Sequence, residues 1–465
     1  MRFAPPSAQA NRQEGEKGNG LLTSEKYVRP ESRSAVNGKL TRANTKPACT
    51  NVPQCAQRDY RSSYSRNLAA ADADDSKNKP KNKELKVNLL NCKYDVVRAV
   101  SNALKFEEVE EESDAQWDLY WTDLSVSMER VARLEPFQCI NHFPGMMEIC
   151  RKATLARNLK KMRALFPNDY DFFPESWSLP SEVHQWRASC RQRRLEGQRA
   201  TYIVKPDAGA MGRGIYLVRR EEDLDLTNPD FIGWVVQEYV ERPLLIDEYK
   251  FDLRLYVLVT SVDPLRIYLF DEGLARFATA KYSKPDNKNI ATMNMHLTNY
   301  SINKKSQDYV SAETDPHKGS KRRLTAIMQL LDSMGHDSKL LMDKIKQLIV
   351  KTLVVVAPYL KSNYRTMNKR STFQRLPSTP SRCFELLGFD VLIDDQLNPL
   401  LMEVNHSPSF EIDTKLDTEI KSCAIRDAIQ ALGLTIDQRE RLLHRQRLAA
   451  KKRLYSGVTQ TPKHL

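Results

Sequence analysis

Two acidic side chains and one amide near the C-terminal end of the sequence have the types and spacing of a metal site. Glu403 and Asn405 lie two residues apart in Leu400–Asn405, and Asp390 ends the apolar segment Phe384–Asp390. Alternate residues of a strand share a face, so these oxygen donors converge if the two segments pair. Mg²⁺ prefers such donors together with nucleotide phosphates. A hydrogen-bonded polar network at a sheet end is the alternative, but unpaired buried carboxylates are costly, which favours a metal if a phosphate site lies nearby.

A glycine-rich segment is the candidate phosphate site. In Ile203–Ile215, a strand ends at Lys205, and Gly209, Gly212 and Gly214 follow in a short turn before the next strand. Glycines let backbone N–H groups approach phosphate oxygens, and a lysine neutralises their charge. The pattern alone is weak, because glycine-rich turns occur widely without phosphate. The strand that follows argues against a dinucleotide fingerprint, which opens a helix.

A third set of residues alternates charge with apolar character. Lys250, Asp252 and Arg254 are separated by Phe251 and Leu253. A strand would place the three charges on one face and the apolar pair on the other. The charges then form either a salt-bridge ladder on a solvated face or the lining of a cleft.

Strands and helices must position these residues. Predicted strands cover 86–90, 201–205, 214–219, 234–240, 251–260, 266–270, 383–393 and 400–405, and predicted helices cover 147–165, 181–196 and 339–360. This mixture predicts an α/β fold built of α+β lobes. The polar stretches 309–323 and 366–382 are predicted to be lids or binding loops.

Composition excludes several classes of protein. The chain has 465 residues, of which 41% are hydrophobic and 28% charged, and its mean hydropathy of -0.57 argues against a membrane bundle. The net charge of +13 lies at the two ends: residues 1–85 hold 16 basic against 9 acidic side chains, 436–465 hold 8 against 2, and 86–435 hold 48 of each. A neutral middle without basic residues interleaved with aromatics argues against a nucleic-acid binder.

The two ends are predicted to differ in structure. Residues 1–85 are poor in aromatics, lack apolar periodicity and predict a disordered basic tail without a secretory signal. Residues 436–455 predict a basic helix, either simply solvated or docked on an acidic surface. Eight cysteines without CxxC spacing predict reduced thiols in a cytosolic protein rather than a zinc site.

Several motifs occur in an order that resembles the tubulin tyrosine ligase-like family, an ATP-grasp fold, with its polyglutamylase branch as the nearest likeness. They are Lys205-Pro with its glycine loop, Gln237–Val240, Lys250–Arg254, Gly273–Thr279, His296–Ser301, Gly319–Lys321 and Leu401–Ser409, extended by Trp117–Trp121, Asn141–Gly145 and Glu148–Lys152. The likeness covers about 86–455. It implies an N-terminal lobe at 86–180, a central lobe at 181–245, a C-terminal catalytic lobe at 246–435, and a microtubule-binding helix and tail at 436–465.

The resemblance also implies roles for individual residues, with ATP and Mg²⁺ as cofactors. ATP would be held by Lys205, Met211, Gly212, Arg213, Gly214, Gln237, Glu238, Tyr239, Val240, Lys250, Asp252, Thr298 and Asn299. Free glutamate would be held by Arg276, Tyr300, Ser301, Lys321 and Lys415, and Mg²⁺ by Asp390, Glu403 and Asn405. Catalysis would rest on Lys205, Glu403 and Arg254, the last facing the reacting carboxylate.

The activity implied by the resemblance is ATP-dependent tubulin polyglutamylation, in which an acylphosphate on a tubulin tail glutamate is attacked by the amine of free glutamate. Two alternatives stay open: a ligase of the same fold that adds glycine or tyrosine, and a non-catalytic microtubule-binding module. The expected partners are tubulin and free L-glutamate, without nucleic acid or membrane. The protein is expected to be a monomer. Its expected location is the cytoplasm and cytoskeleton, including the cilium, axoneme or basal body. Whether the enzyme starts or lengthens a glutamate chain is left open.

Overall fold

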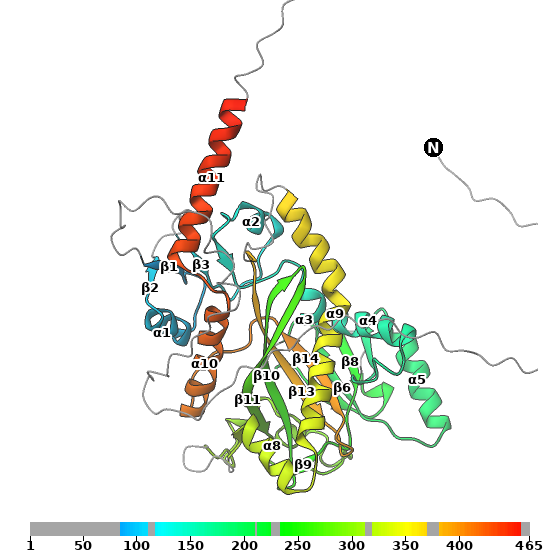
Figure 1. Ribbon diagram of the computed structural model, residues 1–465. Coiled ribbons are helices and arrows are strands. Elements are labelled where there is room, and N and C mark those ends of the chain that lie inside the picture. Colours follow the sequence, from blue (N-terminus) through cyan, green and yellow to red (C-terminus); the bar gives the residue numbers. More distant parts are fainter. Residues whose placement is uncertain are drawn as a thin grey trace, which may run out of the picture. The chain divides into compact units, whose positions relative to one another are not determined.

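The computed structural model describes residues 84–109, 117–209, 212–224, 233–311, 319–369 and 381–456, which form three β-sheets with helices packed between and around them (Figure 1). The prediction of a mixed α/β fold is confirmed. The predicted disordered tail and Met211 lie outside the described residues, apart from Glu84 and Leu85 of the tail. The division into lobes at the stated boundaries stays a prediction.

The first sheet is parallel, with the order β2-β1-β3-β4. Its strands are β1 (Leu85–Asn88), β2 (Phe106–Val109), β3 (Leu119–Tyr120) and β4 (Cys139–Ile140), accompanied by α1 (Asp95–Ala103) and α2 (Met128–Arg133). Helix α1 connects β1 to the parallel β2, as a parallel pair requires. Its buried Val96, Val97 and Val100 belong to the same core as Val87 of β1.

The second sheet is antiparallel, with the order β5-β8-β6-β7. Its strands are β5 (Ser176–Leu179), β6 (Tyr202–Pro206), β7 (Tyr216–Val218) and β8 (Trp234–Glu238), with α3 (Met147–Cys150), α4 (Lys152–Leu165), α5 (Val183–Leu195) and the 3₁₀ turn η2 (Glu221–Asp223). Trp186 of α5 is fully buried against Trp177 and Tyr202 in the core of this sheet.

The single helix predicted over 147–165 is wrong at one residue. Arg151 is extended, with φ -87° and ψ 131°, and separates α3 from α4. The Asp207 carboxylate accepts a hydrogen bond from the Ala153 N–H at 2.8 Å and so satisfies one open donor of the new helix start. The break therefore ties α4 to the segment that follows β6.

The third sheet is the largest and antiparallel, with the order β12-β11-β10-β13-β14 and β9 paired to β10. Its strands are β9 (Leu245–Ile246), β10 (Tyr249–Val262), β11 (Leu265–Phe277), β12 (Lys321–Arg323), β13 (Glu385–Ile393) and β14 (Pro399–Asn405). The remaining helices are α6 (Met293–His296), α7 (Tyr300–Asn303), α8 (Leu324–Ser333), α9 (Ser338–Lys369), α10 (Lys415–Ala431) and α11 (Ile436–Ser456). The long α9 (yellow) runs across one face of this sheet (Figure 1).

Strand β10 explains where the polar site lies. Its odd-numbered residues from Phe251 to Val259 are buried in the core that includes α8 and α9. On the opposite face, Tyr256 and Leu258 are buried in the core that includes α10. At the start of that same face, Lys250, Asp252 and Arg254 replace apolar residues, so one end of this face is charged and the other is covered.

Strand β11 runs further than predicted, and part of a predicted loop is a strand. It continues to Phe277, past the predicted end at 270, and β12 lies inside the stretch predicted as a polar loop. Gly273 pairs with Leu255 of β10, and Leu274–Arg276 pair with β12. This pairing continues the strand past Asp271 and Glu272, whose local preference opposes a strand. Helices α1, α8 and α10 were not predicted.

The predicted basic helix is confirmed as α11. Arg439 donates to the buried Asp118 carboxylate at 2.8 Å, and Gln446 donates to Glu135 at 2.6 Å, which fixes the first half of α11 on the N-terminal segment. Among the described helices, none combines the length and apolar character needed to cross a bilayer. The six cysteines in the described residues are free thiols.

Candidate functional site

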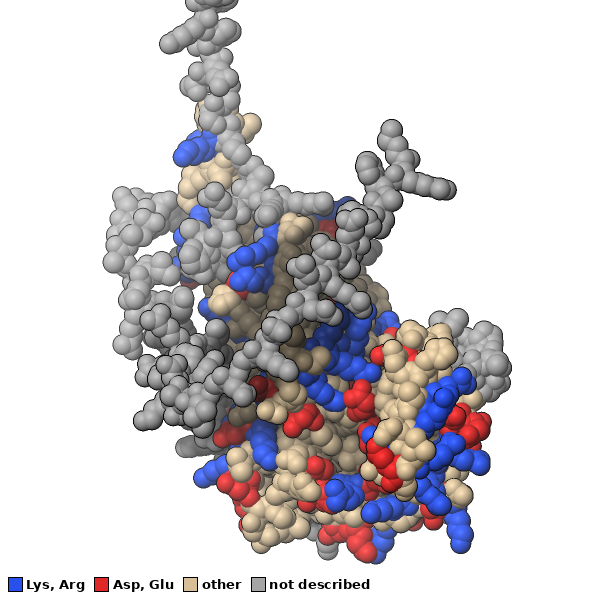
Figure 2. Space-filling view, turned by 90° about the vertical axis from the view of Figure 1, so that its right-hand side faces the viewer, with Lys and Arg blue, Asp and Glu red and all other residues tan. Residues whose placement is uncertain are grey.

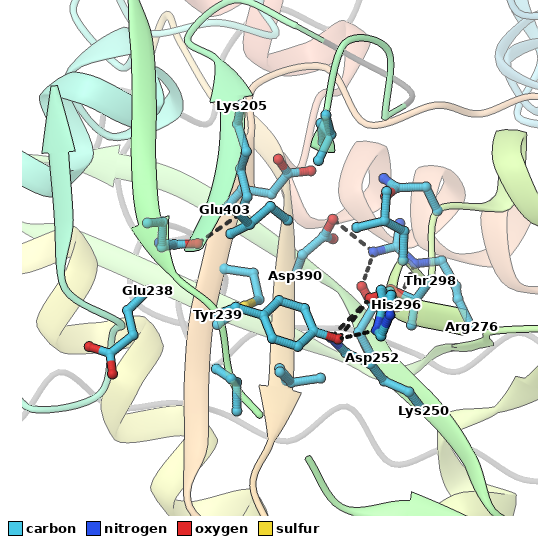
Figure 3. Close-up of a pocket in the computed structure, with 18 residues that line it drawn as sticks. Lys205, Glu238, Tyr239, Lys250, Asp252, Arg276, His296, Thr298, Asp390 and Glu403 are labelled. Atoms are coloured by element: carbon cyan, nitrogen blue, oxygen red, sulfur yellow. Dashed lines mark hydrogen bonds and ion pairs between the residues drawn. The ribbon is translucent and has the colours of Figure 1, made fainter. Parts of the chain in front are cut away.

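A cleft lies between the antiparallel sheet of β5–β8 and the largest sheet (Figure 3). It holds about 650 Å³ of empty space, open solvent at its mouth included, which is within the range of about 300–1,000 Å³ for small-molecule sites. Twelve of the residues predicted from the sequence line it: Lys205, Gln237, Glu238, Tyr239, Val240, Lys250, Asp252, Arg276, Thr298, Asn299, Asp390 and Glu403. The structure thus gathers most of the predicted ATP-binding residues in one place.

Lys205 extends from the end of β6 into this cleft. Its ammonium donates to Gln237 Oε1 of the neighbouring strand β8 at 2.7 Å, and Gln237 Nε2 donates to Ser176 Oγ at 3.0 Å. Burial lowers the pKa of Lys205 to about 8, although the nearby Glu403 carboxylate acts in the opposite direction. The lysine is thereby held in position by neutral partners and keeps its capacity for an anionic ligand.

Lys250 lies at the start of β10 in a similar environment. It donates to the Tyr239 hydroxyl at 2.9 Å and to the His296 carbonyl at 3.0 Å, and its ammonium lies 4.1 Å from the Tyr239 ring centroid. Burial lowers the pKa of Lys250 to about 7. The positive charge of Lys205 lowers this pKa further, whereas the negative charge of Asp252 raises it. Two buried lysines without a full complement of carboxylates form a site in which an anion is stabilised.

The walls of the cleft are apolar. Besides the predicted residues, the lining includes Ile203, Ile215, Leu297, Leu392 and Met402, none of which was singled out from the sequence. The sequence could have indicated three of them, because Ile203, Leu392 and Met402 each lie one or two positions from a predicted site residue on the same strand. Apolar walls with a few placed polar groups are typical of sites for planar organic ligands.

The Glu238 side chain, predicted to contact ATP, is held by an ion pair with α5. Arg193 of α5 donates to both carboxylate oxygens of Glu238 at 2.8 and 2.7 Å. Figure 3 shows this carboxylate pointing away from Lys250, Asp252 and Arg276. The N–H groups of Glu238 and Tyr239 already donate to the Glu175 and Thr201 carbonyls at 2.8 and 2.9 Å. A contact of this segment with ATP therefore stays a prediction.

Four charged side chains are joined by hydrogen bonds: Asp252, Arg276 and Asp390 line the cleft, and Arg254, predicted to be catalytic, lies behind Asp390 and does not line it. Arg254 donates to Asp390 through Nε at 2.5 Å and Nη2 at 3.0 Å, and Arg276 Nη2 donates to Asp390 Oδ2 at 2.8 Å. Arg276 also holds Asp252, with Nε donating to Oδ1 at 2.8 Å. Burial alone would raise the pKa of Asp390, but the guanidinium groups of Arg254 and Arg276 outweigh it and hold that pKa well below its usual range. Asp390 is thus kept ionised, and both carboxylates are fixed in position by the guanidinium groups.

The three predicted metal ligands lie together where the C-terminal end of β14 pairs with the middle of β13. Asp390 and Glu403 are register partners, and Asn405 Nδ2 lies 3.4 Å from Glu403 Oε1. Asp390 Oδ1 accepts a hydrogen bond from Arg254 Nε, and the Glu403 side chain also lies within hydrogen-bond reach of Asp390. Two carboxylates and an amide oxygen form a donor set that fits Mg²⁺. Their role as its ligands stays a prediction.

Lys152 is a site residue that the sequence reasoning did not assign. As the first residue of α4, it donates from Nζ to the Gly209 carbonyl at 3.0 Å and lies 3.6 Å from Glu403 Oε2. It therefore connects the glycine-rich turn to the predicted metal ligands. The motif Glu148–Lys152 was noted in the sequence, but without a role for its lysine.

The glycine-rich turn is only partly described. Gly212 and Gly214 have φ of 71° and 73°, a backbone region that favours glycine. A Cβ on Gly212 would lie 2.6 Å from Ile302 Cδ1, so α7 packs directly against this turn. Arg213 is exposed and, like Gly212 and Gly214, does not line the cleft.

The residues predicted to hold glutamate are mostly brought together. Arg276 on β11 and Lys321 on β12 are register partners, and the Lys321 ammonium lies 3.5 Å from the Tyr300 ring centroid. Ser301 follows Tyr300 in α7. Lys415 differs, because it is exposed at the first residue of α10.

A buried carboxylate holds this region together. Asp417 of α10 accepts a hydrogen bond from Lys321 at 2.6 Å and forms an ion pair with Lys421 at 2.9 Å. Burial lowers the pKa of both lysines, while Asp417 opposes that shift. Lys421 was not predicted, because its helix was not predicted. Two buried lysines that share one carboxylate leave an excess of positive charge here.

Comparison with known proteins places the chain among related sequences. Residues 130–442 match the profile of the Tubulin-tyrosine ligase family. The mouse protein "Tubulin polyglutamylase TTLL13" is 43% identical over 393 residues, which cover 83% of this chain and 47% of that protein. Mouse "Tubulin polyglutamylase TTLL6" is 45% identical over 371 residues, covering 80% and 43%. Human "Tubulin polyglutamylase TTLL7" is 40% identical over 377 residues, covering 81% and 41%. The chain thus spans less than half the length of these relatives.

Proposed function

The chain belongs to the tubulin-tyrosine ligase family, and we propose that it is an ATP-dependent ligase joining free glutamate to glutamate side chains of tubulin tails. The family resemblance and the ATP-grasp fold predicted from the sequence are thereby confirmed. The observation that carries the proposal is the cleft lined by two buried lysines, Lys205 and Lys250, and by the ion-paired residues Asp252, Arg276 and Asp390. The three relatives described above are each named as a tubulin polyglutamylase.

ATP would lie with its base between the apolar walls and its phosphates near the lysines. The base would meet the backbone of Gln237–Val240, and Asp252, Thr298 and Asn299 would contact the ribose and phosphates. Lys205 and Lys250 would neutralise the phosphates, which restores the ammonium charge that burial disfavours. The turn of Met211–Gly214 would cover the triphosphate.

Mg²⁺ would be held by Asp390, Glu403 and Asn405 and would neutralise and orient the phosphate oxygens. The protein's own charges serve the same purpose. Lys152 lies beside Glu403 and the glycine-rich turn. Its ammonium, the third after those of Lys205 and Lys250, would reduce the electrostatic repulsion between the triphosphate and a carboxylate substrate.

Glutamate would be held by Arg276, Tyr300, Ser301, Lys321 and Lys415. The excess of positive charge around Asp417 supports an acidic substrate, since a second carboxylate completes the pairing of Lys321 and Lys421. A glycine substrate has no side chain to use that charge. This favours glutamate over the glycine and tyrosine alternatives.

The reaction transfers the γ-phosphoryl group of ATP to a carboxylate oxygen of the acceptor, giving ADP and an acylphosphate. The amine of free glutamate then attacks the acyl carbon, the C–O bond to phosphate breaks, the nitrogen loses a proton, and inorganic phosphate leaves with an amide formed. Arg254 would face the reacting carboxylate, and Asp390 fixes its guanidinium by two hydrogen bonds. Such a fixed donor stabilises negative charge that develops in the transition state.

The acidic tails of tubulin are the proposed acceptor, and α11 is the proposed contact with the microtubule. This helix carries seven basic and two acidic side chains. Figure 2 shows Lys and Arg at the top of the view, where α11 lies, and mixed signs over the lower part of the face. A cytoskeletal location and action as a monomer are part of the same proposal.

The test is incubation of the chain with microtubules, ATP, Mg²⁺ and one amino acid at a time, followed by mass spectrometry of the tubulin tails. Glutamate should give increments of one glutamyl residue that require ATP. Increments with glycine or tyrosine instead would replace the substrate assignment, and microtubule binding without any increment would identify a non-catalytic module. The branching pattern of the products separates chain initiation from lengthening.

A further inference from the structure

Lys250 is held in the cleft by two oxygen acceptors. Its ammonium donates to the Tyr239 hydroxyl at 2.9 Å and to the His296 carbonyl at 3.0 Å. An ammonium has three N–H donors. Among the described residues, these two contacts leave one donor of Lys250 for a ligand in the cleft that it lines. The direction of this third donor depends on how firmly the two acceptors are fixed.

His296 acts on Lys250 a second time, through its ring. It is the last residue of α6, is fully buried, and lines the cleft, but the sequence gave it no role beyond its motif. Its Nδ1 lies 3.2 Å from the Tyr239 hydroxyl, and its Nε2 lies 3.1 Å from the Asn289 carbonyl. Figure 3 shows the Tyr239 ring reaching toward His296 and Lys250.

The surroundings of the His296 ring fix its tautomer. The Asn289 carbonyl only accepts, so Nε2 carries the hydrogen. Burial lowers the pKa of His296, and the positive charge of Lys250 lowers it further, although the hydrogen bond to Asn289 raises it. The ring is therefore neutral, and Nδ1 is an acceptor without a hydrogen of its own.

Two further acceptors lie near the Tyr239 hydroxyl. The His296 carbonyl lies 3.4 Å away, farther than Nδ1. The Tyr282 hydroxyl is also within reach, but it donates its own hydrogen to the Glu241 carbonyl at 2.8 Å and belongs to a half-buried residue. Nδ1 is fully buried, where an acceptor without a donor is costly. Tyr239 therefore donates to Nδ1, which leaves the lone pairs of its oxygen for the ammonium of Lys250.

We propose that His296 is a positioning residue for Lys250. Its ring orients the Tyr239 hydroxyl, its carbonyl holds the ammonium directly, and the third N–H of Lys250 is thereby directed at an anion in the cleft. A donor that is already fixed loses less conformational entropy on binding, so the anion binds more tightly. The identity of this anion as a phosphate group of ATP rests on the proposed function.

The test measures binding of ATP and of inorganic triphosphate to the full chain with Mg²⁺, by displacement of a fluorescent nucleotide. Inorganic triphosphate has no base, so it separates an effect on Lys250 from the base contact predicted for Tyr239. Tyr239→Phe removes the hydroxyl and keeps the ring. It should weaken binding of both probes about ten-fold, as expected when one hydrogen bond to a charged group is lost.

Two variants of His296 distinguish orientation of Tyr239 from packing. Asparagine places Oδ1 where Nδ1 lies, so His296→Asn keeps an acceptor for Tyr239 and should retain most of the affinity. Glutamine places its amide near Nε2 instead, so His296→Gln should bind both probes about ten-fold more weakly. Tyr282→Phe is the matched control, since its ring centroid lies 6.0 Å from the Lys250 ammonium, and it should bind as the unchanged chain does.

In the ligation assay, Tyr239→Phe and His296→Gln should raise the KM for ATP and leave the KM for glutamate unchanged. Circular dichroism and a thermal melt check that each variant folds, and Tyr239→Phe serves if the His296 variants do not.

Three results would overturn the inference. They are absent or unchanged binding of inorganic triphosphate in Tyr239→Phe and the unchanged chain alike, an equal loss in both His296 variants, and a loss in Tyr282→Phe, which would assign the Tyr239 hydrogen to Tyr282. The expected binding pattern without any glutamate incorporation would contradict the proposed function and leave the role of His296 intact.

Discussion

The cleft and helix α11 are both rich in charge, but the charges are used differently. In the cleft, Arg254 and Asp390 are 12% and 3% exposed and bind each other through two hydrogen bonds. On α11, Lys451 and Lys452 are exposed. Buried charges act at full strength on groups of fixed position, whereas exposed charges are screened beyond about 8 Å at physiological ionic strength. The net charge of the chain therefore reports on attraction to a partner and not on the site.

Glu403→Gln should have the largest effect. It removes one proposed metal ligand without changing side-chain volume, and we expect ATP-dependent glutamate incorporation to fall by at least about 100-fold, as when a group that stabilises the transition state is lost. Incorporation of labelled glutamate measures the effect, with a thermal melt to confirm folding. Glu411→Gln, an exposed position beyond β14, is the matched control. Undiminished incorporation by Glu403→Gln would remove Glu403 from the site.

Asp390→Asn should have the next largest effect, on stability. It leaves Arg254 without its carboxylate in a buried position, and breaking such a pair costs about 3–5 kcal/mol. The surface pair of Arg242 and Asp395 is 62% and 42% exposed, so Asp395→Asn should change stability by only about 0–1 kcal/mol. Denaturant unfolding of both variants measures the contrast. Equal destabilisation would mean that the two pairs do not differ in the way that burial predicts.

Lys250→Met should show a pH dependence that the exposed lysines lack. The pKa of Lys250 is about 7 in the folded chain, against an ordinary lysine value of 10.5. Between these values the unfolded chain binds more protons, so the free energy of unfolding rises with pH. Lys250→Met should therefore raise the free energy of unfolding most at pH 7 or below, relative to the unchanged chain, and this gain should be smaller at pH 9. Denaturant unfolding of both chains at pH 7 and pH 9 measures the gain. A gain that does not depend on pH would contradict the lowered pKa of Lys250.

The exposed charges of α11 should give the smallest effect. Lys451→Gln combined with Lys452→Gln should weaken microtubule binding a few-fold at low salt, and the difference should vanish at high salt. Cosedimentation over a salt series measures it. Lys288→Gln with Lys339→Gln, both exposed elsewhere, is the control pair. Unchanged binding at low salt would make α11 a solvated helix without a docking role.

The sequence predicted those parts of the site that follow from local periodicity. Alternation in Lys250–Arg254 placed three charges on one face of a strand, and β10 has this arrangement. The basic segment 436–455 is a helix because its own composition favours one. Ordered motifs identified the family, and twelve predicted residues line one cleft.

The sequence did not predict contacts between distant segments. Arg151 ends α3 because Asp207, far along the chain, binds the start of α4. Lys421 lies on α10, and the apolar residues of this helix are buried against residues of β10. Without that partner strand, the sequence of α10 did not indicate which face would be buried. Local patterns carry no signal for such pairs, since the stabilising partner is supplied by another element.

By itself, the sequence determined the strand faces, the basic helix, the neutral middle and the family. The tertiary structure alone decided which charges neutralise one another and which residues meet. His142 and Glu385 are 243 residues apart, yet strand pairing brings the imidazoles of His142 and His406 to the Glu385 carboxylate. The physical reason is that burial and pairing, rather than residue type, set the protonation and the ligand geometry of a buried polar group.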